Sequence, residues 1–342
     1  MSHALPLLPI QLTATQAFVL GLIHQLDASL NTLPPGMDDE SLHPANFPDL
    51  FHFYIKGGAA AAIHLHHDKE FPFPDINDID VEVALEPDLS EDLQKGLLSA
   101  LIREITGTLI DLLSSPAARD CETEWRLYRL PYRGRTSGPI RIHDTGYTSW
   151  NLAGNATFTE LFADLSFRAL RLTESPFRLQ VFPNLFWKSQ PLNLAIVRVS
   201  PNIEGPAGTS LLDIVLTKPS LEDTEHNAHL RWMWESVKPQ RLTFSGELGR
   251  RVPSLPIADP LSIVLDQRLA ANLNTRPEKV ARRRARANAL FPAAAAANAG
   301  RLAELRASSH RFKTGKRPAN MLGGGRQRRR RQTVRRLRVP SN

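Results

Sequence analysis

The segment 78–85 constrains the fold more than any other, because its side chains alternate between acidic and apolar. Its acids are Asp78, Asp80 and Glu82, and the β-branched residues Ile79, Val81 and Val83 stand between and after them. A period of two is typical of a β-strand, so the acids share one face and the apolar residues share the other. Acids on one face repel each other unless a cation lies between them, and Mg²⁺ prefers carboxylate oxygens together with substrate phosphates. The segment therefore predicts a strand that carries a phosphate-handling metal site.

A glycine pair lies upstream of this strand. Gly57 and Gly58 follow an apolar stretch that ends at Lys56, and the run 59–65 after them favours a helix. Residues without a side chain let backbone amides approach phosphate groups closely. The pair therefore predicts a phosphate-binding turn between an extended segment and a helix.

A third candidate acid stands in the segment 192–217, which is typical of a β-hairpin. An apolar run at 194–199 is followed by turn-forming residues at 201–208 and by a second apolar run at 211–216. Asp213 is the one acid within the second run. Two interpretations stay open, since Asp213 is either a metal ligand or the partner of a nearby arginine such as Arg198.

These elements, in this order, resemble the nucleotidyltransferase superfamily of the DNA polymerase β type. The family pattern is an apolar residue, Gly, and then Gly or Ser, followed by an acid-x-acid strand and later by a lone acid on a neighbouring strand. The matching residues here are Ile55-Lys56-Gly57-Gly58, Asp78-Ile79-Asp80 and Leu212-Asp213-Ile214. The Lys-Gly-Gly form is similar to that of viral poly(A) polymerases and AbiEii-type toxin nucleotidyltransferases. One departure is Ala59, which stands where the family commonly has Ser, Thr or Asn.

The resemblance implies a mechanism for this chain. Asp78, Asp80 and Asp213 would bind Mg²⁺ (or Mn²⁺), and Asp213 would share the metal that activates the attacking hydroxyl or act as the base. Lys56 and the Gly57-Gly58 turn would bind the nucleotide. The implied reaction is nucleotidyl transfer from an NTP to a hydroxyl, with release of pyrophosphate.

Charge is distributed very unevenly along the chain. Residues 276–342 contain 20 of the 42 Lys and Arg residues but only 2 of the 35 Asp and Glu residues. Such a segment predicts a disordered basic tail that binds a polyanion, with RNA favoured over DNA as the acceptor. A localisation signal and a dock for an acidic partner are the other interpretations. The arginines that we expect to contact nucleic acid are Arg282, Arg283, Arg284, Arg328, Arg329, Arg330, Arg331, Arg335 and Arg336.

The remaining features set the expected organisation. We expect an α+β fold with a nucleotidyltransferase-like mixed sheet and flanking helices over 1–220, including an insertion at about 115–190. A helical accessory portion at 221–275 and the basic tail at 276–342 would follow. Helical spacing of apolar residues predicts helices at 11–33 and 89–113.

Cellular location follows from what the sequence lacks. The N-terminus has no basic region typical of a signal peptide, and no run of about 18 uncharged apolar residues predicts a membrane span. Cys121 is the single cysteine, which excludes an internal disulfide and fits a reducing compartment. A cytoplasmic location, or a nuclear one in a eukaryotic host, is therefore expected.

A different class of function also fits these residues. A non-catalytic nucleic-acid-binding or virion protein could keep a degenerate nucleotidyltransferase fold and use the arginine-rich segment for anchoring. Ala59 favours this alternative, because a hydroxyl or amide that would contact the triphosphate is missing.

Overall fold

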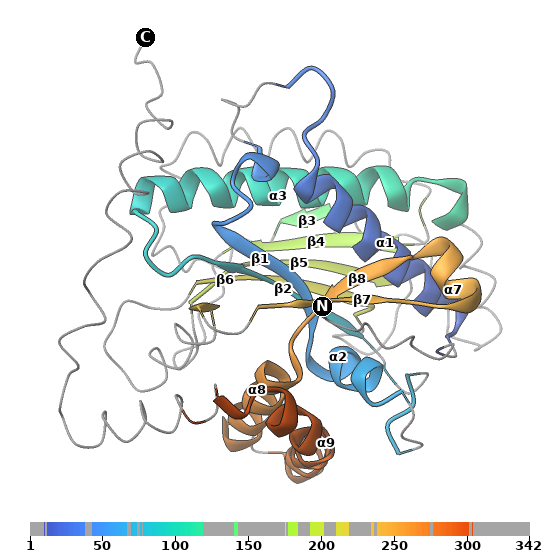
Figure 1. Cartoon of the computed structure of the whole chain (residues 1–342). Helices are drawn as coiled ribbons and strands as arrows, with labels where there is room; N and C mark the ends of the chain where they lie inside the picture. Colours follow the sequence, from blue (N-terminus) through green and yellow to red (C-terminus); the bar gives the residue numbers. More distant parts are fainter. Residues whose placement is uncertain are drawn as a thin grey trace.

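In the part of the chain that the structure describes, an eight-stranded mixed sheet lies between the helices (Figure 1). The computed structural model describes residues 10–118 with gaps at 11, 38–42, 67–69, 74, 75 and 77, then 140–142, 175–183 without 176, 192–201, 210–218, 234–273 without 236 and 237, 276–300, and 303. The strands in spatial order are β3 (Ile140–Ile142), β4 (Phe177–Pro183), β5 (Leu192–Pro201), β6 (Leu212–Lys218), β2 (Ile79–Leu85), β1 (Phe51–Lys56), β8 (Ser254–Ile257) and β7 (Gln240–Thr243). The pairs β2–β6, β1–β8 and β3–β4 are parallel and the others are antiparallel. The expected mixed sheet is therefore confirmed.

Helices lie on both sides of this sheet. Two long helices, α1 (Ala14–Asn31) and α3 (Glu91–Leu113), cover one face, while α2 (Gly57–His64), α8 (Pro260–Leu273) and α9 (Pro277–Ala297) lie on the other side (Figure 1). Thr13 opens α1 with a capping box that includes Gln16, and Ser90 caps α3, so both helices expected from the sequence are confirmed. In the described part of the chain, every helix falls short of the length and apolar character that a membrane crossing needs.

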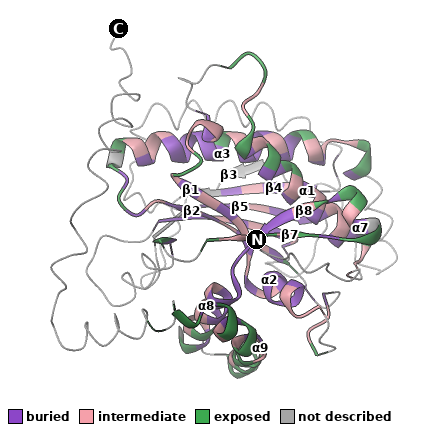
Figure 2. Ribbon diagram, in the orientation of Figure 1, coloured by how far each residue is buried: buried purple, intermediate pink, exposed green. Residues whose placement is uncertain are grey.

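The sheet is apolar on the face beneath α1 and α3. Register neighbours on six adjacent strands form one completely buried row, which consists of Ile257, Ile55, Val81, Ile214, Val197 and Val181. On the same face Phe177 of β4 stacks on Phe18 of α1, with ring centroids 5.2 Å apart. Burying each such side chain contributes about 1.5–3 kcal/mol to folding. Buried residues recur along the central strands in Figure 2, and the alternation along each strand fixes which side chains point to the opposite face.

The portion expected to be helical differs from that expectation. Within 221–275, the described residues include β7, the short helix α7 (Gly246–Arg251) and β8 as well as α8. The backbone N–H of Ala258 donates to the carbonyl of Ile55 at 2.9 Å, directly after β8 has paired with β1. The two strands are only four residues long, too short for a strand period to stand out in the sequence. They extend the main sheet rather than form a separate accessory portion.

The start of the expected disordered tail is also different, because α9 is a helix packed against α8. Its buried residues Ala287, Leu290 and Ala294 recur at helical spacing, and two of them are small enough for a close approach. Arg283 donates to the carbonyl of Ala270 at 2.7 Å, near the C-terminal end of α8. These contacts explain why residues 277–297 form a packed helix, although composition alone assigns them to the tail. The expected arginines from Arg328 onward lie outside the described residues.

Asp259 joins three elements where β8 passes into α8. Its carboxylate accepts hydrogen bonds from the backbone N–H of Leu261, from Gln240 of β7 at 2.6 Å and from Asn298 just after α9 at 3.3 Å. All three donors reach a side chain that is almost completely buried. The beginning of α8 is thereby tied to the end of α9 and to the edge of the sheet.

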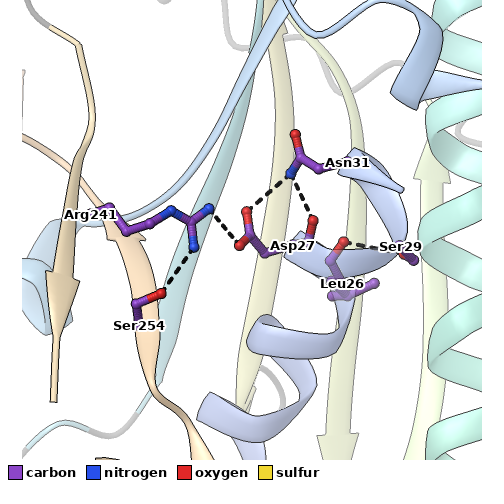
Figure 3. A network of polar contacts seen from close by, with 6 residues as sticks. All are labelled: Leu26, Asp27, Ser29, Asn31, Arg241 and Ser254. Atoms are coloured by element: carbon purple, nitrogen blue, oxygen red, sulfur yellow. Dashed lines mark hydrogen bonds and ion pairs between the residues drawn. The ribbon is translucent and has the colours of Figure 1, made fainter. Parts of the chain in front are cut away.

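A polar network also ties the β7–β8 edge to α1 (Figure 3). Arg241 of β7 forms an ion pair with Asp27 of α1 at 2.7 Å and donates to Ser254 of β8 at 3.2 Å. Asn31 donates to the other carboxylate oxygen of Asp27 at 3.2 Å. Asp27 is buried while Arg241 is half exposed, so the contact bridges the core and the surface.

Breaking this network should destabilise the fold. We expect Arg241→Gln to lower the free energy of unfolding by about 1–2 kcal/mol, because the buried carboxylate of Asp27 loses its cation. Asp27→Asn should cost a similar amount, and the double variant should cost less than the sum, as measured by urea unfolding. Strictly additive losses would contradict a direct interaction between the two side chains.

Candidate active site

A row of charged side chains crosses the face of the sheet opposite the apolar row. Lys56 of β1 is the register partner of Asp80 of β2, Asp80 pairs with Asp213 of the parallel strand β6, and Asp213 pairs with Arg198 of β5. Because register partners on neighbouring strands point to the same face, the four side chains lie side by side. Two acids therefore stand at the centre of the row, with a cation on either side.

Strand pairing brings Asp78, the remaining predicted acid, to the same end of the sheet. The backbone N–H of Ile79 donates to the carbonyl of Leu211 at 3.0 Å, so β2 and β6 begin level with each other. Asp78 directly precedes β2 and is exposed. Although the residue is open to solvent, desolvation by the surrounding chain raises the pKa of Asp78, and the carboxylate of Asp213 raises it further.

Asp213 is held by an arginine rather than left free. Nε of Arg198 donates to Oδ1 of Asp213 and Nη2 donates to Oδ2, both at 2.8 Å, and the hydroxyl of Ser210 also donates to Oδ1. This is the two-pronged geometry in which an arginine binds a carboxylate most strongly. Of the two interpretations that the sequence left open, the arginine partner is the one found here. The ion pair fixes the position of the Asp213 carboxylate beside Asp80.

Asp80 is the most perturbed acid of the row. Burial, followed by the repulsion of Asp78, raises its pKa from an ordinary 3.8 to about 7, and Lys56 only partly opposes this. A methyl group added to Gly57 would lie 2.7 Å from Oδ2 of Asp80, so the carboxylate rests directly against the glycine backbone. The two motifs found in the sequence therefore meet in space.

The glycine pair forms the first turn of α2. Gly57 has a φ of +66°, a left-handed conformation that favours glycine, and this lets the chain pass from β1 into the helix without a linker. Gly58 lies against Arg286 of α9, since an added methyl would meet its Nη1 at 2.6 Å. The N-terminus of α2, which is the positive end of its dipole, thus lies against the carboxylate of Asp80.

Lys56, predicted to bind nucleotide, is directed toward Glu82 at 3.3 Å. Burial would lower the pKa of Lys56, but Glu82, Asp266 of α8 and Asp80 together raise it. Glu82 also accepts a hydrogen bond from Thr217 at 2.6 Å, and burial would raise its pKa but Lys56 and its hydrogen-bond donors lower it. Lys56 therefore joins the row to a partly buried charge network that includes Glu82 and Asp266.

Metal chemistry at this site depends on Asp80 of β2 and on Asp78, which directly precedes that strand. In the described residues, no three acidic, histidine or cysteine side chains are grouped to hold one metal ion as they stand. Asp213 has both oxygens bonded to Arg198, whereas Asp78 and Asp80 are two repelling carboxylates of the kind that Mg²⁺ and Mn²⁺ prefer. The donor set therefore fits a hard divalent cation at Asp78 and Asp80, with Asp213 as their neighbour.

The predicted nucleic-acid-binding arginines are only partly described. Arg282 and Arg284 of α9 are exposed, and Arg283 is bonded to Ala270 of α8. The six predicted positions from Arg328 to Arg336 lie outside the described residues.

Two residues near the candidate site were not identified by the sequence analysis. Asp266 is an acid within the apolar run of α8, a signal of the same kind as Asp213. Arg286 is concealed in an arginine-rich stretch, and only the apolar spacing of Ala287, Leu290 and Ala294 marks the face of the helix beside it.

Comparison of the chain with protein-family models, curated proteins and solved structures found no match.

The two glycines should respond in opposite ways to alanine. Gly57→Ala should lower the free energy of unfolding by about 2 kcal/mol, because the residue has a positive φ and the new methyl meets the Asp80 carboxylate. Gly58→Ala should be neutral or stabilising by up to about 1 kcal/mol, since only the flexible end of Arg286 must move. Chemical unfolding measures both, and equal losses would contradict the described turn.

The raised pKa of Asp80 predicts a pH-dependent stability. Between its unfolded value near 3.8 and its folded value of about 7, the folded protein binds more protons, so its contribution to stability falls as the pH rises through this window. We expect Asp80→Asn to be about 2 kcal/mol more stable than the wild type at pH 8, with the difference vanishing near pH 4. Urea unfolding at both pH values measures this.

The exposed acid Asp111 of α3 offers the matched control. Asp111→Asn should show no comparable pH-dependent gain. Mg²⁺ should raise the melting temperature of the wild type at pH 8 but not that of Asp80→Asn. A gain for Asp80→Asn that does not change with pH would contradict the repulsion between the acids.

Proposed function

We propose that the protein is a metal-dependent nucleotidyltransferase that transfers a nucleotide from an NTP to a hydroxyl acceptor. The observation that carries the proposal is the position of Asp80, with its carboxylate against Gly57 at the start of α2 and Asp213 as its register partner on β6. Paired acids beside a glycine turn at a helix N-terminus bring a cation site and an anion site together. A metal–triphosphate is the substrate chemistry that needs both.

Each part of the site has a distinct task in this proposal. Asp78 and Asp80 hold the divalent cation, which when bound neutralises phosphate charge and makes a hydroxyl more acidic. The backbone of Gly57 and Gly58 orients the phosphates at the positive end of α2. Asp213, fixed by Arg198, holds the acceptor hydroxyl by accepting its hydrogen bond.

RNA is the acceptor class that this proposal favours. The support is the basic composition of residues 276–342. Positive side chains that neutralise phosphates bind RNA regardless of the RNA sequence. Transfer to tRNA or to a protein hydroxyl, as in toxin-like enzymes, belongs to the same reaction class.

The ion pair between Arg198 and Asp213 supports a second candidate. An acid whose two oxygens are both engaged by arginine is poorly disposed to bind a metal. A non-catalytic nucleic-acid-binding protein with a degenerate nucleotidyltransferase fold would retain such a pair for stability alone. The two candidates differ in what Asp213 contributes to turnover.

Transfer of label decides between them. The wild type, incubated with Mg²⁺ or Mn²⁺, each labelled NTP and an RNA pool, should label the RNA, and Asp78→Ala with Asp80→Ala should reduce the rate by about 10³-fold or more. Asp213→Asn should reduce it at least about tenfold while the RNA affinity stays unchanged. Gel autoradiography and filter binding measure the two quantities.

Three results would count against the enzyme. They are no transfer by the wild type with any NTP, equal transfer by the Asp78/Asp80 variant, and RNA binding without turnover. The last would favour the non-catalytic candidate. Asp111→Asn is the activity control, because that exposed acid lies on α3, across the sheet from the site.

A further inference from the structure

The helix α9 carries a basic face beside the candidate site. Lys279, Arg282 and Arg286 are spaced by three and four residues, so they lie one above another on the helix. Lys279 attracts the carboxylate of Asp78, and Arg286 is attracted by both Asp78 and Asp80. The cations therefore stand opposite the acids of β2.

Arg286 lies deepest of the three. A methyl on Gly58 would meet its Nη1 at 2.6 Å and its Cζ at 3.3 Å, which places the guanidinium over the first turn of α2. Its Nε is buried and has no hydrogen-bond partner within the part of the chain that the structure describes. Ala287, the next residue, is completely buried, so the backbone at this point is fixed. The backbone that carries Arg286 is thus held in place, and its guanidinium, with Nε unused within the described residues, faces the glycine turn.

Arg286 stands among other cations, a setting that favours the binding of an anion. Burial lowers the pKa of Arg286, and repulsion by Arg282 lowers it further, with only partial relief from Asp78. A polyphosphate bound there would relieve this repulsion, because its oxygens carry the opposite charge.

We propose that Arg286 is a polyphosphate-binding residue, which grips the triphosphate of the nucleotide against the Gly57-Gly58 turn, with Arg282 and Lys279 along the same face. The proposal rests on the proposed nucleotidyl transfer and names the residue that holds its leaving group. A planar guanidinium binds two phosphate oxygens at once, and the amides at the start of α2 complete the cradle. The helix that composition assigns to RNA binding then serves the nucleotide.

Calorimetric titration of the full chain with inorganic tripolyphosphate and Mg²⁺ tests this directly. Arg286→Gln should weaken binding by about 10- to 100-fold, and Arg286→Lys should restore part of it. Arg284→Gln is the matched control, because Arg284 is exposed on the same helix, and it should change the affinity less than about twofold. Thermal unfolding verifies that each variant is folded.

Gly58→Ala provides a second test that leaves every charge in place. Its methyl must displace the guanidinium of Arg286, so we expect weaker tripolyphosphate binding with no loss of stability. Combined with Arg286→Gln it should add almost nothing, because both changes act on the same contact. Gly21→Ala, in α1 with open space around it, is the control and should bind normally.

The outcomes separate this proposal from the proposed function. Unchanged affinity in Arg286→Gln, or equal losses in Arg286→Gln and Arg284→Gln, would overturn it. So would a loss of RNA binding alone, which would make α9 a nucleic-acid-backbone contact. If the wild type transfers no label but binds tripolyphosphate through Arg286, the enzyme proposal fails and the polyphosphate site stands.

Discussion

The parallel pairing of β2 with β6 is the constraint on which the candidate site depends. It aligns Asp80 with Asp213 and, one residue further on, Val81 with Ile214. A shift of one residue would turn an aspartate into the apolar face and an isoleucine out of it, which burial forbids. The hydrophobic row therefore fixes the position of the charged row, although the two lie on opposite faces. Packing energy on one side of the sheet holds repelling charges together on the other.

The sequence predicted those parts in which a local period repeats over enough residues. The alternation at 78–85 identified the β2 strand, and Ser90 with the helical spacing after it identified α3. The hairpin that carries Asp213 was found in the same way. The partner of Asp213 stayed open, because the register that brings Arg198 opposite depends on the strand pairing. Short strands such as β7 and β8 gave no period to detect.

The assignment of α9 failed for a different reason. Alanine and arginine make up most of its sequence, and composition favours disorder where few large apolar residues are present. Ala287, Leu290 and Ala294 bury little area, but they are sufficient because α8 lies close and Arg283 closes the contact at Ala270. Arg286 could be placed only once this packing was known. Lys56 was likewise expected to contact the phosphates. Its interactions with Glu82 and Asp266 could not be predicted, because Asp266 lies on α8, far away in the sequence.

The hydrogen bonds to Asp259 tie the residue after α9 to the start of α8 and to the edge of the sheet. Asn298, beyond the end of α9, bonds to a carboxylate that also receives the backbone of Leu261 and the side chain of Gln240. A cut at residue 276, chosen by charge alone, would remove a helix, uncover the apolar side of α8 and leave Asp259 short of a donor. Shortened versions of the protein should therefore retain residues up to about 300, and any deletion meant to isolate the basic segment has to begin after that point.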